Sequence, residues 1–229
     1  MRYAILLLGF STLLSAETFQ VALVKPLWRD GKGTLEITDQ GIAYRASATK
    51  QMSWNWLDIQ YFDRLSRREF VILTYKDDWR LLGRDKQYHF RITKGELSDA
   101  LFERISEHLK RPVTDRVIPP GTTATYSIPV KRENTFKGSE GTLEFSNDTI
   151  YYVTGDRRDA RVWRMDRDIV SVWSDDPYRL EIRAYDNNRR EFSRTATYKF
   201  DLKQKLDPDF YRRLKLRLYG LEVNNKVLR

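Results

Sequence analysis

Hydrophobic and polar residues alternate along several short stretches of this chain, with the period of half-buried β-strands. The clearest examples are residues 18–24, 33–38 and 88–92. After Ser98 the period changes to four, because Leu101, Ile105 and Leu109 recur on one helical stripe. The pattern therefore predicts a run of strands closed by one amphipathic helix, with expected strands over residues 18–24, 33–38, 42–44, 54–62, 70–75, 79–82 and 88–92.

The fourth expected strand has a change of phase. Trp54 and Trp56 share one face of it, whereas Ile59 and Tyr61 fall on the other. A bulge or kink near residues 57–58 would turn both pairs toward the core.

The stretch Gly33–Tyr44 organises the chain, because it returns 108 residues later as Gly141–Tyr152. Six of the twelve positions are identical, and three more are chemically close. The later elements repeat as well, at an offset that drifts only to 110. The sequence is therefore a tandem duplication, whose second copy has expected strands over 125–130, 141–146, 149–153, 162–173, 180–185 and 198–202 and a helix after Asp207-Pro208.

The first sixteen residues have the layout of a secretory signal peptide, with Arg2, an apolar run over residues 3–10 and a small residue at Ala16. We expect cleavage after Ala16 and export to the periplasm or the medium. A proline-rich stretch separates the two repeats. The predicted organisation is a signal peptide over 1–16, a first repeat over 17–112, a linker over 113–123 and a second repeat over 124–229.

Composition narrows the class of protein. The chain has no cysteine, so disulfides, thiolate nucleophiles and cysteine metal sites are excluded. Residues 17–114 hold 17 basic against 14 acidic residues, and residues 115–229 hold 23 against 18. This shared positive excess favours anionic partners, but it is far weaker than the basic stripe of a nucleic-acid binder.

The order of seven strands and one closing helix resembles the pleckstrin-homology-like superfold, especially its bacterial and GRAM-type members. In the first repeat the residues that carry the resemblance are 33–44, 56–59, 70–75, 88–92 and the helix from Ser98. The resemblance implies a mainly β fold, in which two tandem seven-stranded sandwiches or barrels are each closed by an amphipathic helix. A closed lipocalin-like barrel or a pair of small sandwiches is the alternative.

No constellation of residues predicts catalysis. His89 is expected to face solvent, His108 lies at a helix end, and neither recurs in the second repeat. Asp58 and Asp168 do recur, which favours a shared structural role such as capping a turn or pairing with arginine. We therefore expect no catalytic residue, no metal and no cofactor.

Candidate contact residues lie in the first loop of each repeat. Pleckstrin-homology domains present basic residues there to phosphorylated lipid headgroups, but the arginine that closes such a site is replaced by Leu35-Glu36 and Leu143-Glu144. Trp28 is expected to anchor a partner, with Phe136 as its counterpart. Trp79, Trp163 and Trp173 are expected to pack in the core. The candidate residues are Lys25, Trp28, Arg29, Lys32, Lys131, Arg132, Phe136 and Lys137.

Three functions are compatible with this sequence. The first is a binding or scaffold protein of the cell envelope that recognises a protein or peptide beside strands 70–75 or 180–185, or beside the C-terminal helix. The second is attachment to an anionic membrane surface through the basic first loops. The third, ranked last, is a hydrolase that uses a carboxylate pair.

Overall fold

The computed structural model describes residues 16–25, 29–79, 83–111, 113–134, 138–188 and 193–220. These residues form fifteen strands and two α-helices, with one short 3-10 helix, so the expectation of a mainly β protein is confirmed. The expected signal peptide lies almost wholly outside the described residues, which begin at Ala16.

The first repeat has seven strands and a helix. The expected strand over 54–62 is wrong as one element: its kink is a 3-10 turn, η1, that divides it into β4 and β5. Trp79 lies in the turn after β6, and the rest of the expected strand 79–82 lies outside the described residues. The elements are β1 Glu17–Val24, β2 Gly31–Thr38, β3 Gly41–Ser47, β4 Lys50–Asn55, η1 Trp56–Asp58, β5 Ile59–Ser66, β6 Glu69–Asp77, β7 Asp85–Lys94 and α1 Asp99–Leu109.

The second repeat follows the same order. Its expected strand over 162–173 is also divided, by a turn between β12 and β13. The elements are β9 Tyr126–Arg132, β10 Ser139–Phe145, β11 Thr149–Thr154, β12 Arg161–Arg164, β13 Ile169–Trp173, β14 Arg179–Asn188, β15 Ser193–Leu202 and α2 Pro208–Leu218.

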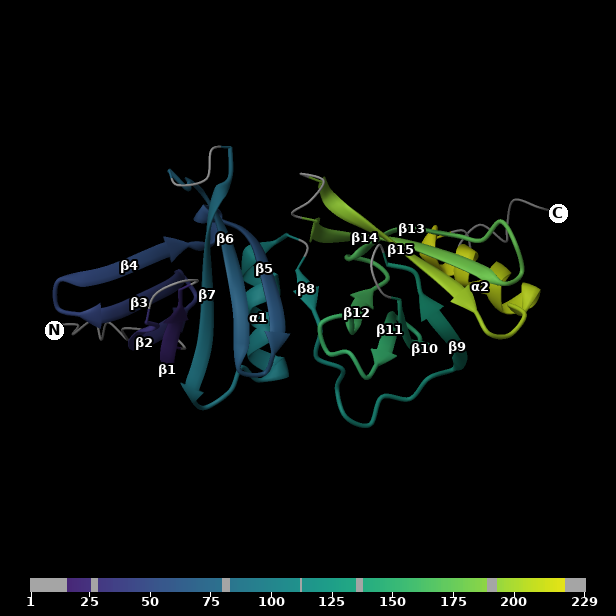
Figure 1. The fold of residues 1–229 in the computed structure, drawn as a ribbon, viewed down its shortest axis with the longest axis horizontal. Coiled ribbons are helices and arrows are strands. Elements are labelled where there is room, and N and C mark those ends of the chain that lie inside the picture. The colour runs from purple at the N-terminus through teal and green to yellow at the C-terminus, as the bar shows by residue number, and fades with distance from the viewer. Residues whose placement is uncertain are drawn as a thin grey trace, which may run out of the picture.

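The two repeats also share their strand order in space. The first is arranged β5-β6-β7-β1-β2-β3-β4, and the second β13-β14-β15-β9-β10-β11-β12. Within the expected linker, Thr114–Asp115 form a further strand, β8, which pairs parallel to β5 and antiparallel to β12. The hydrogen-bonded sheet therefore runs without a break through both repeats, which lie side by side with β8 between them (Figure 1).

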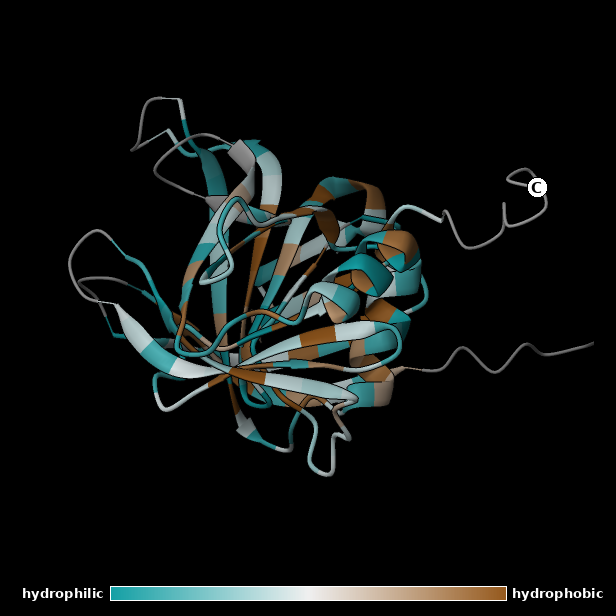
Figure 2. Cartoon of the chain, turned by 90° about the vertical axis from the view of Figure 1, so that its right-hand side faces the viewer, coloured by the Kyte–Doolittle hydropathy of each residue, from teal (hydrophilic) through white to brown (hydrophobic). Residues whose placement is uncertain are grey.

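Each repeat has its own apolar core. Residues from β1–β7 and α1 form one cluster of buried side chains, and residues from β9–β15 and α2 form the other. The helices begin as their sequences predict, since Ser98 and Asp207 accept hydrogen bonds from the first turns. Figure 2 shows the apolar positions alternating with hydrophilic ones along the strands. In the described part of the chain, neither helix is long and apolar enough to span a membrane.

In each repeat a tyrosine ring packs against the glycine that opens the duplicated stretch. A Cβ atom on Gly33 would lie 2.7 Å from the Tyr44 ring, and one on Gly141 would lie 2.8 Å from the Tyr152 ring. Each tyrosine hydroxyl donates a hydrogen bond of 2.8 Å to a backbone carbonyl two residues before its glycine. The close approach of ring to backbone therefore requires glycine at both positions.

The repeated aspartates have the structural role expected of them. Asp58 accepts a hydrogen bond from the backbone N–H of Asn55, and buried Asp168 accepts one from that of Arg164. Asp168 also pairs with Arg167 at 2.8 Å. Both carboxylates hold the turn that divides the expected fourth strand.

Candidate functional site

Among the residues that the structure describes, the continuous sheet ends in two strands, β13 and β4, that each have a strand partner on one side only. The expectation of a peptide beside residues 70–75 or 180–185 is wrong, because β6 and β14 each lie between two paired strands. Within the described structure a strand-adding partner would find the outer side of β13 or β4 without a paired strand, although the Val172 carbonyl of β13 already accepts a hydrogen bond from Lys215.

The two edges differ in their side chains. β4 carries exposed Lys50, Gln51, Ser53 and Asn55, and polar residues of this kind protect an edge from pairing. β13 reads Ile-Val-Ser-Val-Trp and carries no charge. β13 is therefore the less protected of the two edges.

Two residues of β13 are open to solvent. The Trp173 side chain is 58% exposed and Val170 is 36% exposed. Trp79 is also exposed, so the expectation that Trp79 and Trp173 pack in the core is wrong, whereas Trp163 is buried as expected. The signal that could have identified this edge is the absence of any charged residue over 169–173.

Helix α2 lies beside the β13 edge. The Lys215 ammonium donates a hydrogen bond of 3.0 Å to the Val172 carbonyl. The same ammonium lies 5.5 Å from the Trp173 ring and 4.9 Å from the Tyr219 ring. These cation–π contacts hold an aromatic surface between the strand and the end of the helix. We call β13 with Lys215 and Tyr219 the β13 edge site.

The basic candidates of the first repeat lie beside an acidic residue. Lys25 donates its backbone N–H to Asp30, and the Asp30 carboxylate lies 3.5 Å from Arg91. Arg29 and Lys32 are exposed. Trp28 lies outside the described residues.

The basic candidates of the second repeat are not equivalent to one another. Lys131 is exposed, but Arg132 pairs with Asp159 at 2.9 Å and lies 4.6 Å from the Tyr198 ring. Arg132 is therefore held by its own repeat. Phe136 and Lys137 lie outside the described residues.

A network of buried charges joins the two repeats. The Arg161 Nε donates hydrogen bonds to Tyr198 at 2.9 Å and to Asp186 at 3.3 Å, all within the second repeat. Asp186 also accepts a hydrogen bond of 2.7 Å from Tyr61 and one of 3.1 Å from Thr114, which belong to β5 and β8. The Asp186 carboxylate therefore accepts hydrogen bonds from its own repeat and from β5 and β8.

A second charge pair and a bidentate pair extend this network. Arg116 pairs with Asp63 at 2.7 Å, and its guanidinium also reaches the backbone carbonyl of Arg158 in the second repeat. Buried Arg64 holds Asp115 of β8 through two hydrogen bonds, of 2.7 and 2.5 Å. The geometry matches the planar fork of arginine to a carboxylate.

Burial and pairing with arginine shift the pKa values of these carboxylates in opposite directions. Burial alone would raise the pKa of Asp186, but the charge of Arg161 and the hydroxyls of Tyr198 and Tyr61 hold it below its usual range. At Asp63 burial prevails over Arg116, so its pKa is raised. Burial also raises the pKa of the Tyr198 hydroxyl. The network therefore keeps one carboxylate strongly ionised and serves to hold the repeats together.

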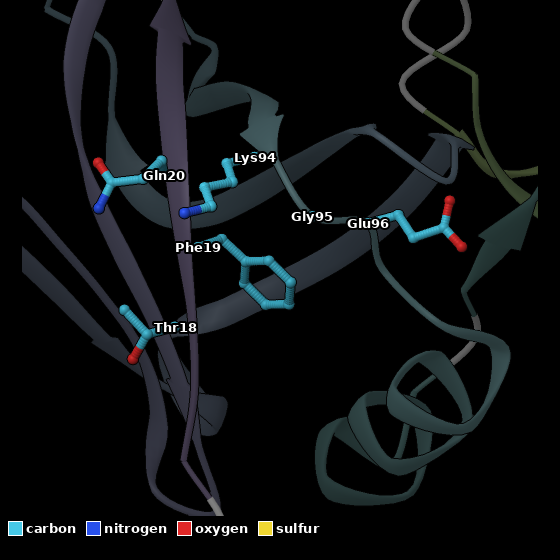
Figure 3. A pocket seen from close by; sticks show the side chains of 6 residues that line it. All are labelled: Thr18, Phe19, Gln20, Lys94, Gly95 and Glu96. Atoms are coloured by element: carbon cyan, nitrogen blue, oxygen red, sulfur yellow. The ribbon is translucent and has the colours of Figure 1, made fainter.

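A shallow hollow of about 400 Å³ lies away from this network, at the start of β1 and the end of β7. Phe19 points into it, with Lys94 and Gln20 beside it and Glu96 on the far side (Figure 3). The β1–β7 pairing changes register beside this hollow, between Gln20 and Val21. The hollow brings no pair of carboxylates together.

Each of the two histidines lies beside a carboxylate. His89 lies 2.8 Å from Glu69, and His108 lies 3.3 Å from Asp39 and stacks on Trp56. Among the residues that the structure describes, no group of three His, Asp or Glu side chains could hold a metal ion.

The solved structures that resemble this chain include two with low TM-scores. No protein-family model matches this sequence, and a search of curated proteins finds no match. The C-terminal domain of an unknown protein from Leishmania infantum is similar over 43% of this chain and 86% of its own, with 13% identity and a TM-score of 0.31. The Spt16D Pob3N heterodimer is similar over 80% of this chain and 94% of its own, with 10% identity and a TM-score of 0.33. Neither score is high enough to decide the fold family or the function.

Proposed function

We propose that this chain is a non-enzymatic binding or scaffold protein of the cell envelope, which recognises an extended segment of a protein partner at the β13 edge site. In this mode the partner adds a strand to the open edge of the sheet, main-chain hydrogen bonds supply affinity, and alternate side chains supply specificity. The observation that carries the proposal is that β13 ends the described sheet, has no charged residue and exposes the side chain of Trp173.

We further propose that residues 17–112 and 124–229 are two pleckstrin-homology-like domains. The identical strand order of the two repeats and the single helix that follows each set of strands support this assignment. The separate apolar cores support the division into two domains.

The chemistry of the edge favours an apolar or aromatic partner strand. Val170 is the extra residue at a bulge in the β13–β14 pairing, and Trp173 lies at the end of the strand. Trp173 belongs to the residue types that dominate binding energy at interfaces. The Lys215 ammonium lies at the same edge, where it donates a hydrogen bond to the Val172 carbonyl.

Site-specific crosslinking tests the proposal. A photoreactive benzoylphenylalanine is placed at Val170, and the chain is irradiated in the native envelope. We expect a crosslinked protein partner, and we expect Ser171→Pro to abolish the crosslink, because proline removes a backbone donor and disfavours an added strand.

The matched control carries the photoreactive group at Ser53 of the polar β4 edge. Crosslinks of equal yield at positions 53 and 170, or no crosslink at 170, would overturn the assignment of β13 as the binding edge.

A further inference from the structure

The first repeat shows how the β5 edge of this fold receives an added segment. β8 pairs parallel to β5, opposite Asp63 and Arg64. Buried Arg64 holds the Asp115 carboxylate of β8 through two hydrogen bonds. The edge therefore takes an extended segment whose carboxylate meets a cation of the receiving repeat.

Helix α1 receives part of the same junction. The Glu103 carboxylate lies 2.7 Å from Arg164 and 3.8 Å from Arg167, which both belong to the second repeat. Buried Ser106 accepts a hydrogen bond from Arg167. We call Glu103 and Ser106 the helix flank of the first repeat. An acidic and a small polar side chain on this flank thus receive two arginines.

The second repeat has the corresponding strand and helix at the β13 edge site. The register of β13 on β14 matches that of β5 on β6 at an offset of 110 residues. The N-caps of the two helices, Ser98 and Asp207, are 109 residues apart. Within the described chain, no strand pairs with the outer side of β13. The surface that receives the junction in the first repeat therefore has a counterpart at the β13 edge site.

The charge of the helix flank is reversed in the second repeat. Arg212 occupies the position of Glu103, and Lys215 occupies that of Ser106. Over its whole length α1 has three acidic residues and one arginine, whereas α2 has one acidic residue and four basic ones. A neighbour that presents arginines suits the flank of α1 but would be repelled by that of α2, which attracts carboxylates instead.

Lys215 has no ion-pair partner among the residues that the structure describes. Its ammonium donates one hydrogen bond, to Val172, and lies 5.5, 5.8 and 4.9 Å from the rings of Trp173, Tyr211 and Tyr219. An ammonium has three N–H donors, so two remain for a carboxylate of a partner.

Arg212 is also available to a partner. It pairs with Asp209 of the same helix at 3.1 Å, but the two side chains are 73% and 70% exposed. An exposed pair of this kind is worth little and gives way readily to a better contact.

From the reversed flank we infer that the protein segment bound at the β13 edge site is acidic, with carboxylates that meet Lys215 and Arg212. This inference rests on the proposed function and names the chemistry of its partner. Apolar residues of the segment, which alternate with the acidic ones, pack on Trp173.

The hydrogen bond between Lys215 and Val172 is compatible with such a segment. β8 pairs with the counterparts of Trp173 and Ser174, which begin one residue beyond Val172. A segment placed as β8 is placed therefore pairs beside the Val172 carbonyl and not with it.

Two peptides that carry the same dye serve as probes, Thr-Val-Glu-Val-Glu-Val-Thr and its glutamine counterpart Thr-Val-Gln-Val-Gln-Val-Thr. Their binding to the chain that remains after the expected cleavage at Ala16 is measured by fluorescence anisotropy. We expect the glutamate peptide to bind about 10-fold more tightly, as two partly exposed charge contacts allow. Added salt should remove most of this difference.

A double variant tests which residues give the preference. Arg212→Glu with Lys215→Ser gives α2 the residues that α1 has at the matching positions, so each side chain is one that this helix already accepts in the first repeat. The double variant should bind both peptides with equal, low affinity. The matched control is Arg213→Glu, because Arg213 is exposed on the same helix but two residues from Lys215, so the two side chains do not face each other. This control should keep the preference.

Each other outcome overturns the inference in a recognisable way. Equal affinity of the unaltered chain for the two peptides would refute an acidic partner but leave strand addition at β13 intact. Binding of neither peptide would also refute the inference, and the crosslink at position 170 in the native envelope would then decide the proposed function separately. Loss of the preference in Arg213→Glu would show a general charge effect and not a contact of this flank.

Co-sedimentation with phosphatidylglycerol vesicles tests the rival ligand. If the unaltered chain binds these vesicles, the double variant does not, and the peptides show no preference, the cations of α2 serve a lipid surface. That result would overturn the acidic protein segment as the partner.

Discussion

Replacing Arg161 by methionine is the most informative perturbation of the repeat junction. Methionine is the residue at the matching place in the first repeat, where Met52 pairs with Tyr44 as Arg161 pairs with Tyr152. It removes the cation that faces Asp186, whose side chain is buried and which accepts hydrogen bonds from Tyr61 and Thr114. The carboxylate would then remain buried with hydroxyl partners but without its arginine.

The expected loss in the free energy of unfolding follows from the cost of a buried charge that has lost its partner. Breaking such a pair costs about 3–5 kcal/mol, and we expect about 3 kcal/mol because the hydroxyls of Tyr61, Thr114 and Tyr198 still bind Asp186. For a chain of this length that loss corresponds to a melting temperature lower by about 6–12 °C.

The assay is urea unfolding followed by tryptophan fluorescence, with Arg164→Met as the matched control. Arg164 lies on the same strand and also joins the repeats, through Glu103 at 2.7 Å, but its side chain is 40% exposed. An exposed pair of this kind is worth about 0–1 kcal/mol, so the control should change stability little.

A double variant separates the charge from the packing. If the cost of Arg161→Met comes from the orphaned carboxylate, adding Asp186→Leu should recover more than half of it. Equal losses for Arg161→Met and Arg164→Met, or no recovery in the double variant, would refute the assignment of Asp186 as the residue that ties the repeats together.

Three further predictions concern other residues. Gly141→Ala should cost about 2–3 kcal/mol in urea unfolding, because its Cβ would lie 2.2 Å from a backbone carbonyl, whereas Gly155→Ala, with nothing within 4 Å, should cost less than about 0.5 kcal/mol. The lowered pKa of Asp186 contributes stability that is present above the unfolded pKa of about 3.9 and is lost as pH falls through the folded pKa. Asp186→Asn should therefore reduce the loss of unfolding free energy below pH of about 4. An unchanged slope of unfolding free energy against pH would contradict this. If the basic first loops bound an anionic membrane, Lys32→Glu with Lys131→Glu would cost at least about 2 kcal/mol of vesicle binding, roughly 30-fold; we expect no measurable change in co-sedimentation, and a salt-sensitive loss would favour the membrane function instead.

Much of the fold could be predicted from local pattern. The alternation of residues 18–24 and 88–92, the caps at Ser98 and Asp207 and the tandem repeat all reflect local periodicity or backbone chemistry, which the sequence states directly. The repeated aspartates were predictable as structural for the same reason, since duplication preserved them at equivalent turns.

The division of residues 54–62 was only partly predictable. The change of phase indicated a kink, but the separation of β4 from β5 depends on which strands each half pairs with. Likewise, the exposure of Trp173 could not be predicted from its own residue type, because an aromatic residue in a strand usually packs in a core.

The sequence by itself determined the two repeats, most of their strands and their closing helices, because these depend on local spacing and periodicity. The tertiary structure alone decided which strands lie at the edges, that Thr114–Asp115 join the repeats, and that Asp186 meets Tyr61 across 125 residues of chain. Such contacts depend on how two folded units pack against each other. A local pattern of hydrophobic and polar residues carries no information about which distant residues will meet.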